Sequence, residues 1–241
     1  MNLIKRLISL SITISLSLIS ASALAEGKPV GITPNLFDIT IKHKGKLVKL
    51  MRNQDTSATI DGTFARTSRP CPPACIRPMS LGKGIETIGE IEIINYAKTI
   101  SDGDKNTLLI DSRTPDQAAG GTIPGSINIS WVELTPREGA TTESIMKLLS
   151  DRFDVTVMEG KDDIDVDEAI AGGDTSDVFD YTKAKTLVMF CNGSWCGQSP
   201  ASIAALRKFG YPANKILSWW NAKLEKPRSN NSYVINIYPS K

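Results

Sequence analysis

Cys191 is the residue of this sequence best placed to act as a nucleophile. It follows the apolar run 186–190, which predicts a buried strand, and it begins the loop Asn192-Gly193-Ser194-Trp195-Cys196-Gly197. We expect Ser199 to cap a helix that begins at Pro200, because serine is a favoured N-cap and proline suits the first helical position. Backbone N–H groups of such a loop and helix start favour a thiolate and can hold an anion. The pattern therefore predicts a reactive thiolate in an anion-binding loop.

Cys196 is a second thiol in the same loop, and two interpretations of it stay open. It could resolve a redox reaction by forming a disulfide with Cys191, or it could be an ordinary loop residue. Cys191 itself could be inert, since a buried free cysteine packs as a small hydrophobic residue. No Arg or Lys lies between Cys191 and Arg207. This argues against phosphatase or arsenate-reductase chemistry, which needs an arginine for the oxyanion.

The segments around Cys191 alternate between strand and helix patterns. Apolar runs predict strands at 108–110, ending in Asp111, and at 127–129, 186–190 and 216–217, whereas longer periodic stretches predict helices at 85–100, 142–149 and 200–209. Strands separated by helices indicate a parallel α/β sheet. Ligands of such sheets bind beyond the carboxyl ends of the strands, which is where Cys191 falls.

Two motifs together resemble the rhodanese family of sulfurtransferases. The first is the corner Asp111-Ser112-Arg113 after a strand, followed by the turn Gly121-Thr122-Ile123-Pro124-Gly125-Ser126. The second is the Cys191 loop with the helix after it. The resemblance covers about residues 85–225 and is specific because two independent motifs coincide. It implies a rhodanese-like parallel sheet flanked by helices, with Asp111 and Arg113 supporting the site.

The resemblance also implies a reaction. Cys191 would take the sulfane sulfur of a small donor such as thiosulfate, form a persulfide, and pass the sulfur to a thiol or cyanide. The loop amides would stabilise the anionic persulfide with preorganised hydrogen bonds. Two alternatives remain: a thiol–disulfide redox protein that uses Cys191 and Cys196, and a non-catalytic binding module on a rhodanese scaffold.

The first 25 residues have the pattern of a secretory signal peptide. Lys5 and Arg6 precede an apolar stretch at 7–19, and small residues mark a cleavage site after Ala25. The stretch is shorter than the roughly 20 residues that span a membrane, so we expect no span after cleavage. A mature protein in the periplasm, an oxidising compartment, is the expectation.

Residues 26–84 predict a small β-rich extension ahead of the rhodanese-like region 85–241. Two alternating runs flank a turn at 43–46, where we expect His43 to be exposed to solvent. Further along, the corner Cys71-Pro72-Pro73-Ala74-Cys75 resembles the extension carried by some exported rhodaneses. A structural disulfide is the favoured interpretation of its two cysteines, because two cysteines without a nearby histidine are weak evidence for a metal.

Residues 151–185 have the composition of an acidic insertion, which we interpret as a candidate surface for a periplasmic protein partner. Its acidic residues have calcium-loop-like spacing, but the central glycine and final glutamate of such a loop are missing. We instead expect a strand with Ile164 and Val166 facing inward. No metal cluster or dinucleotide loop is visible, so the pattern predicts neither a metal nor a cofactor.

The charge balance of the chain excludes a class of partner. The sequence has 28 basic and 26 acidic residues. The signal segment carries two of the basic residues and none of the acidic ones, so the mature chain is neutral. Nucleic-acid binding, which depends on basic patches, is therefore not expected.

Overall fold

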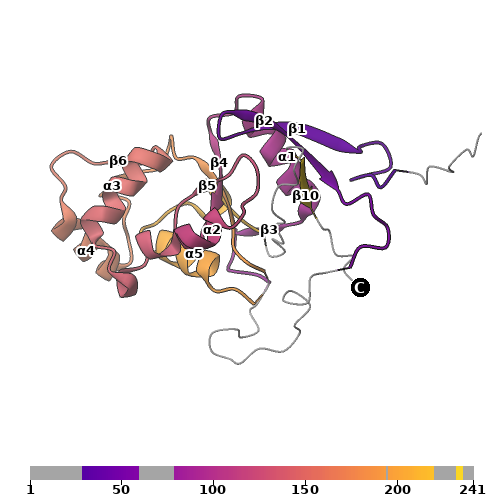
Figure 1. The fold of residues 1–241 in the computed structure, drawn as a ribbon. Helices are drawn as coiled ribbons and strands as arrows, with labels where there is room; N and C mark the ends of the chain where they lie inside the picture. Colours follow the sequence, from indigo (N-terminus) through magenta and orange to yellow (C-terminus); the bar gives the residue numbers. More distant parts are fainter. Residues whose placement is uncertain (1–28, 60–78, 194, 220–231, 236–241) are drawn as a thin grey trace, which may run out of the picture.

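A five-stranded parallel sheet forms the centre of the structure (Figure 1). The computed structural model describes residues 29–59, 79–193, 195–219 and 232–235. In sheet order the strands are β3 (Glu86–Ile88), β9 (Ile216–Trp219), β8 (Thr186–Phe190), β4 (Thr107–Asp111) and β5 (Ile127–Asn128). All neighbouring strands pair in parallel. This confirms the parallel α/β fold that the sequence predicts.

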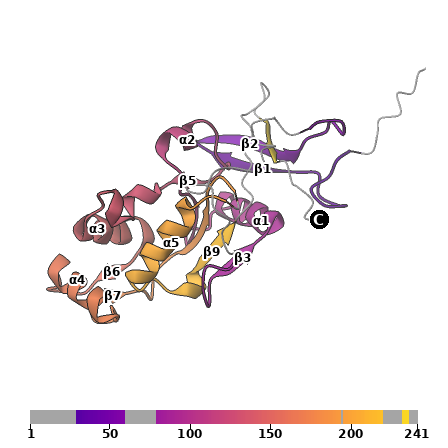
Figure 2. The same ribbon diagram turned by 90° about the horizontal axis from the view of Figure 1, so that it is seen from below.

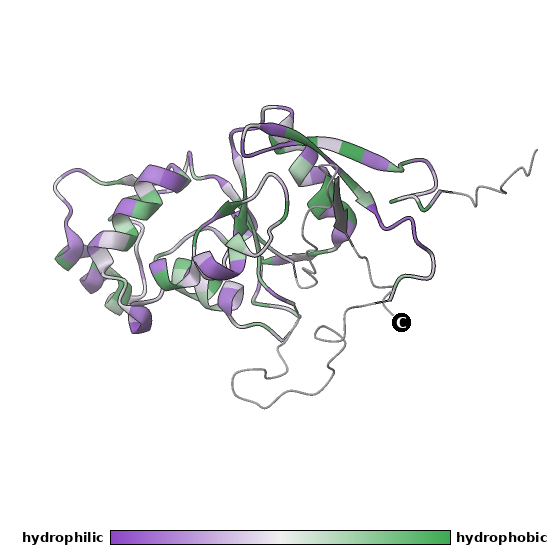
Figure 3. Ribbon diagram, in the orientation of Figure 1, coloured by the Kyte–Doolittle hydropathy of each residue, from purple (hydrophilic) through white to green (hydrophobic). Residues whose placement is uncertain are grey.

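Helices cover both faces of this sheet (Figure 2). Successive residues of a strand point to opposite faces, so each central strand contributes to two separate cores. On one face Leu109 and Val188 pack with Ile93 of α1 (Glu90–Ser101). On the other face Ile110 and Met189 belong to the core that α3 (Thr142–Phe153) and α5 (Gln198–Lys208) complete. Hydrophobic residues accordingly run along the central strands in Figure 3.

Helices α1 and α3 differ from the bounds that the sequence predicts for them. A helix over 85–100 is wrong for its first residues, which form β3 and pair in parallel with β9. The helix predicted at 142–149 begins where expected but runs on to Phe153. Thr141 caps it, because its hydroxyl oxygen accepts the N–H of Ser144 at 3.1 Å.

The strand expected around Ile164 and Val166 is wrong, because these residues lie in α4 (Asp163–Gly172). Asp162 starts the helix by accepting the N–H groups of Ile164 at 3.0 Å and Asp165 at 3.1 Å. Val166 is buried, whereas 65% of Ile164 is exposed, so the two do not share an inward face. The short antiparallel strands β6 (Thr156–Val157) and β7 (Phe179–Asp180) complete this region. In the described residues no group of side chains is placed to hold a metal ion.

The N-terminal part contains the predicted hairpin, β1 (Asp38–His43) and β2 (Lys46–Arg52). Its two-residue turn has positive φ at Lys44 (48°) and Gly45 (78°), as tight hairpins require. A third strand, β10 (Ser232–Ile235), pairs in parallel with β2. The sequence analysis did not predict this strand, although Tyr233, Val234 and Ile235 are residues that favour strands.

The hairpin packs against α1, so the extension and the main sheet share one core. Ile41 and Leu50 of the hairpin are buried in the same cluster as Ile93. The expectation that His43 is exposed is wrong, since only 6% of it is accessible. Its Nδ1 accepts the N–H of Gly125 at 3.1 Å, which ties the hairpin to the turn after Asp111 and Arg113. Burial and the positive charge of Lys44 both lower the pKa of His43.

The remaining helical segments are short. They are α2 (Pro115–Ala119) and the 3-10 helices η1 (Trp131–Glu133), η2 (Pro136–Glu138) and η3 (Ala213–Lys215). Within the described ranges, no helix has the length and apolar character needed to cross a membrane. The signal segment 1–25, Cys71 and Cys75 lie outside the described residues.

Candidate active site

Cys191 lies immediately after β8, at the carboxyl edge of the sheet, and only 3% of it is exposed. The loop after it turns back where the N–H of Cys196 donates to the carbonyl of Gly193 at 2.9 Å. Gly193 has a φ of 148°, a conformation that side chains rarely adopt. The loop therefore folds back on itself directly after Cys191.

The helix after the loop begins two residues earlier than expected. α5 starts at Gln198 with Gly197 as its N-cap, so the assignment of Ser199 as the cap is wrong. Pro200 is still accommodated, because N–H groups in the first turn have no partner within the helix. Ser199, in that first turn, is instead available to the site. Its hydroxyl donates to Cys191 Sγ at 3.3 Å.

Hydrogen bonds to Cys191 Sγ favour its ionised form. Burial opposes ionisation, but four donors outweigh it: the thiol of Cys196, the hydroxyl and N–H of Ser199, and the N–H of Gly193. Together they lower the pKa of Cys191 from its ordinary 9.0 to about 6. Cys191 is therefore mostly a thiolate at neutral pH, which is the nucleophilic form of the residue.

Cys196 has the opposite character. Its hydrogen bond to Cys191, its burial and the negative charge on Cys191 raise its pKa far above the ordinary range. Only 3% of it is exposed, and its sulfur lies 3.4 Å from Gln198 Oε1 and 3.9 Å from Asn192 Nδ2. Neither cysteine forms a disulfide in the structure. The pair thus consists of one thiolate and one thiol that holds its proton.

Asp111 and Arg113 form a buried ion pair beside this loop. Arg113 Nε donates to Asp111 Oδ1 at 2.8 Å, and Arg113 Nη2 donates to Oδ2 at 2.6 Å. The same guanidinium reaches the carbonyl of Gly121 at 2.5 Å and Asn192 Oδ1 at 3.5 Å. The structure therefore brings together the two motifs that lie about eighty residues apart in the sequence.

Further side chains connect the loop, the corner after β4 and the neighbouring helices. Gln198 Nε2 donates to Gln117 Oε1 at 3.0 Å and links α5 to α2. Thr122 donates its hydroxyl to Asp111 Oδ2 at 2.7 Å, which gives that carboxylate a further partner. Trp195, at the outer side of the loop, is 37% exposed. Ser194 lies outside the described residues.

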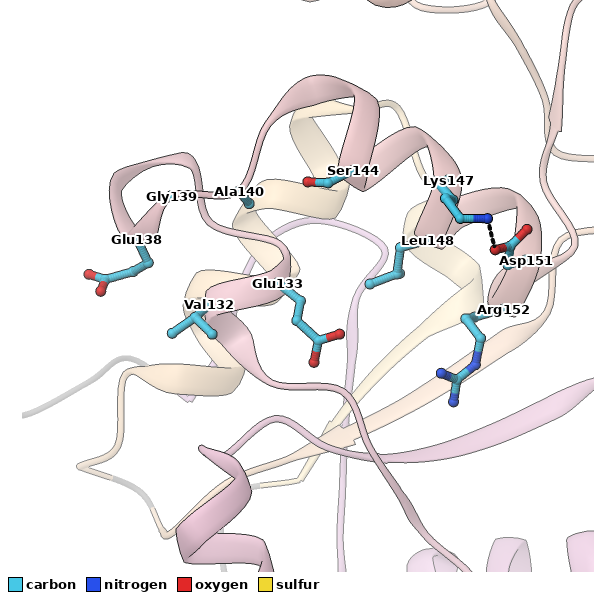
Figure 4. A pocket seen from close by; sticks show the side chains of 10 residues that line it. All are labelled: Val132, Glu133, Glu138, Gly139, Ala140, Ser144, Lys147, Leu148, Asp151 and Arg152. Atoms are coloured by element: carbon cyan, nitrogen blue, oxygen red, sulfur yellow. Dashed lines mark hydrogen bonds and ion pairs between the residues drawn. The ribbon is translucent and has the colours of Figure 1, made fainter.

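A separate pocket of about 420 Å³ lies between α3 and the 3-10 helices η1 and η2 (Figure 4). It is lined by Val132, Glu133, Glu138, Gly139, Ala140, Ser144, Lys147, Leu148, Asp151 and Arg152. Lys147 pairs with Asp151 along the helix at 2.6 Å, and Ser144 Oγ accepts the N–H of Thr141, the N-cap of α3, at 3.0 Å. The lining includes no residue of the Cys191 loop, so this pocket is distinct from the thiolate site.

Alkylation of Cys191 should follow the pKa of its thiolate. We expect the rate of reaction with iodoacetamide to rise with pH around a midpoint of about 6, because only the thiolate reacts. Replacing Ser199 by alanine should move this midpoint upward, since it removes a donor to the charged sulfur. Mass spectrometry of peptide 186–207, with fragmentation to locate the adduct, measures both rates. Midpoints near 9 in both proteins would contradict the hydrogen-bonded thiolate.

The sheet order, the buried acid–arginine corner and the thiolate loop define an α/β domain built around one cysteine at a strand end. Comparison with known families agrees: the Rhodanese-like domain model matches residues 95–219, which is more than half of the chain. The chain therefore belongs to the rhodanese-like family. No curated protein matches it.

Among solved structures, the chain is similar to the 3-mercaptopyruvate sulfotransferase SseA from Escherichia coli, whose description names the rhodanese fold. The sequence identity is 18% and the TM-score is 0.35. The similarity covers 57% of this chain and 41% of that chain, so the matched part is less than half the length of SseA.

Proposed function

We propose that this protein is an exported sulfurtransferase that carries sulfane sulfur on Cys191. One observation carries the proposal: the buried Cys191 Sγ accepts hydrogen bonds from four donors, and it does so within a rhodanese-like domain. Those donors make Cys191 a thiolate at neutral pH. Its position after β8 places it at the edge of the sheet where ligands of parallel α/β folds bind. A cysteine that served only in packing would need no such donors.

The reaction has two halves. In the first, Cys191 Sγ attacks the outer sulfur of a donor such as thiosulfate, the donor's S–S bond breaks, and sulfite leaves with the electron pair. In the second, an acceptor thiol or cyanide attacks the outer sulfur of the Cys191 persulfide, and the thiolate leaves. The N–H groups of Gly193 and Ser199 that now hold the thiolate also suit the anionic persulfide.

Recognition of an anionic donor would depend on backbone rather than on a loop cation. The loop and α5 offer no Lys or Arg before Arg207. The guanidinium of Arg113 is engaged by Asp111 and Gly121. What remains is the amino-terminal end of α5 and the loop N–H groups, whose partial positive charge attracts anions.

The proposed location is the periplasm, supported by the signal pattern at 1–25 with cleavage after Ala25. In that compartment Cys71 and Cys75 would form a structural disulfide. The natural acceptor would then be a thiol of a small molecule or of a periplasmic protein, and the acidic surface of 151–185 is a candidate docking site for such a protein.

Steady-state kinetics test the proposal. With freshly reduced protein, thiocyanate should form from thiosulfate and cyanide, and double-reciprocal plots at several cyanide concentrations should be parallel. Parallel lines are expected because the first product leaves before the second substrate reacts. Intersecting lines, or no thiocyanate from either the wild type or Cys196→Ser with any sulfane-sulfur donor, would contradict a sulfur-carrying cysteine.

A further inference from the structure

The loop holds a second thiol, Cys196, beside Cys191, and the family reaction uses only one cysteine. The thiol of Cys196 lies within hydrogen-bonding reach of Cys191 Sγ. The turn between Gly193 and Cys196 produces this contact by folding the loop back on itself. Both cysteines are only 3% exposed, so an external thiol has little access to either sulfur.

Neighbouring side chains fix the Cys196 sulfur in this position. Gln198 Oε1 lies 3.4 Å from it and Asn192 Nδ2 lies 3.9 Å from it. Gln198 is held in turn by Gln117, and Asn192 contacts Arg113. The single proton of Cys196 can point either to Cys191 or to Gln198. A thiol held this way beside a reactive sulfur has the placement that thiol–disulfide exchange requires.

We propose that Cys196 resolves the Cys191 persulfide and releases the carried sulfur as hydrogen sulfide. The inference rests on the proposed function, because it needs a persulfide on Cys191. It adds a second reaction to the same site: the protein would reduce a sulfane-sulfur donor with its own two thiols. In this reaction no external thiol has to reach the buried sulfur.

The step balances without an added oxidant. Cys196 Sγ attacks Cys191 Sγ, the bond from Cys191 to the outer sulfur breaks, and a disulfide joins the two cysteines. The outer sulfur leaves with the electron pair and takes the Cys196 proton, so it departs as hydrogen sulfide. Over both steps one thiosulfate and two thiols give one sulfite, one hydrogen sulfide and one disulfide. An external dithiol must then reduce the disulfide before another cycle.

The test is a single turnover without acceptor. Purified wild-type protein and Cys196→Ser, both freshly reduced, are mixed with excess thiosulfate, which is then removed. Hydrogen sulfide is measured, and peptide 186–207 is analysed by mass spectrometry. This tryptic peptide contains Cys191 and Cys196 but not Cys71 or Cys75. Disulfides elsewhere in the chain therefore do not affect the mass of this peptide.

Wild type should release about one hydrogen sulfide per protein and yield the peptide with an internal disulfide, about 2 Da below the dithiol. Cys196→Ser keeps a hydroxyl that can donate to Cys191 but cannot form a disulfide with it, so this variant should form the persulfide and keep the added sulfur of about 32 Da. Its sulfide release should fall at least about tenfold. Cys196→Ala gives the same comparison should the serine variant fold poorly.

Three results would overturn the inference. If wild type keeps the added sulfur without a disulfide, Cys196 does not resolve it, although the proposed function stands. If Cys196→Ser releases sulfide as fast as wild type, the sulfide has another source. If neither protein acquires sulfur from thiosulfate or forms thiocyanate, the proposed function fails and the inference fails with it.

Discussion

Replacing Cys191 by serine should lower sulfur transfer from thiosulfate to cyanide by at least about a thousandfold. The hydroxyl of serine stays protonated at neutral pH, so the four donors that surround the sulfur have no anion to stabilise. An oxygen nucleophile also cannot carry sulfane sulfur as a persulfide does. Thiocyanate formation under saturating donor and acceptor measures the effect.

Ser199→Ala is the matched control for this variant. It removes one donor to Cys191 but leaves the sulfur in place, so we expect a loss of about ten- to a hundredfold in rate, about 1.4–2.7 kcal/mol of transition-state stabilisation. Urea unfolding of both variants shows whether either loses its fold. A folded Cys191→Ser protein that retains more than a tenth of the wild-type rate would contradict the assignment.

Replacing Asp111 by alanine should destabilise the protein by about 3–5 kcal/mol. The Asp111 carboxylate is fully buried and accepts two hydrogen bonds from the guanidinium of Arg113. Without it, the arginine charge remains buried without its counter-ion, which costs far more than the loss of a surface contact. The free energy of unfolding in urea measures the change.

Asp38→Ala is the control for the buried ion pair. Asp38 pairs with Lys49 across the hairpin at 3.1 Å, and both side chains remain partly exposed. Exposed pairs contribute at most about 1 kcal/mol, so this variant should stay close to wild type. Equal destabilisation by the two substitutions would show that the Asp111–Arg113 pair has no special role in stability.

The central sheet was predictable from the sequence because its signals are local. Strands buried on both faces appear as short continuous apolar runs, and 186–190 is such a run. The same kind of signal failed at Ile164 and Val166, where two alternating residues do not distinguish a strand from a helix. The N-cap residue Asp162 is a local signal for the start of a helix, but it was not used in the prediction.

Contacts between residues far apart in the sequence explain the other differences between the prediction and the structure. β3 exists because it pairs with β9, about 130 residues further on, and β10 exists beside β2 for the same reason. His43 is buried because Gly125 and the α1 side of the sheet lie against the hairpin. None of these partners is near in the sequence, so composition and periodicity alone do not reveal them.

The nucleophile and the buried corner were predicted, whereas the network around them was not. Cys191, Asp111 and Arg113 belong to motifs with fixed local order. Ser199 was predicted only as a helix cap, whereas its hydroxyl donates to Cys191 Sγ and Gly197 is the N-cap. The link from Gln117 to Gln198 depends on the folded sheet, which brings together side chains 81 positions apart.

The sulfite released in a single turnover is the most direct measurement of the central claim, that Cys191 accepts sulfane sulfur. Reduced protein is mixed with excess thiosulfate in the absence of an acceptor, and sulfite is measured over time beside Cys191→Ser. We predict a burst of about one sulfite per wild-type protein and none from the variant, because sulfite leaves only when Cys191 takes the outer sulfur. This result is the same whether or not Cys196 later resolves the persulfide. No burst from the wild type, or an equal burst from Cys191→Ser, would contradict the account.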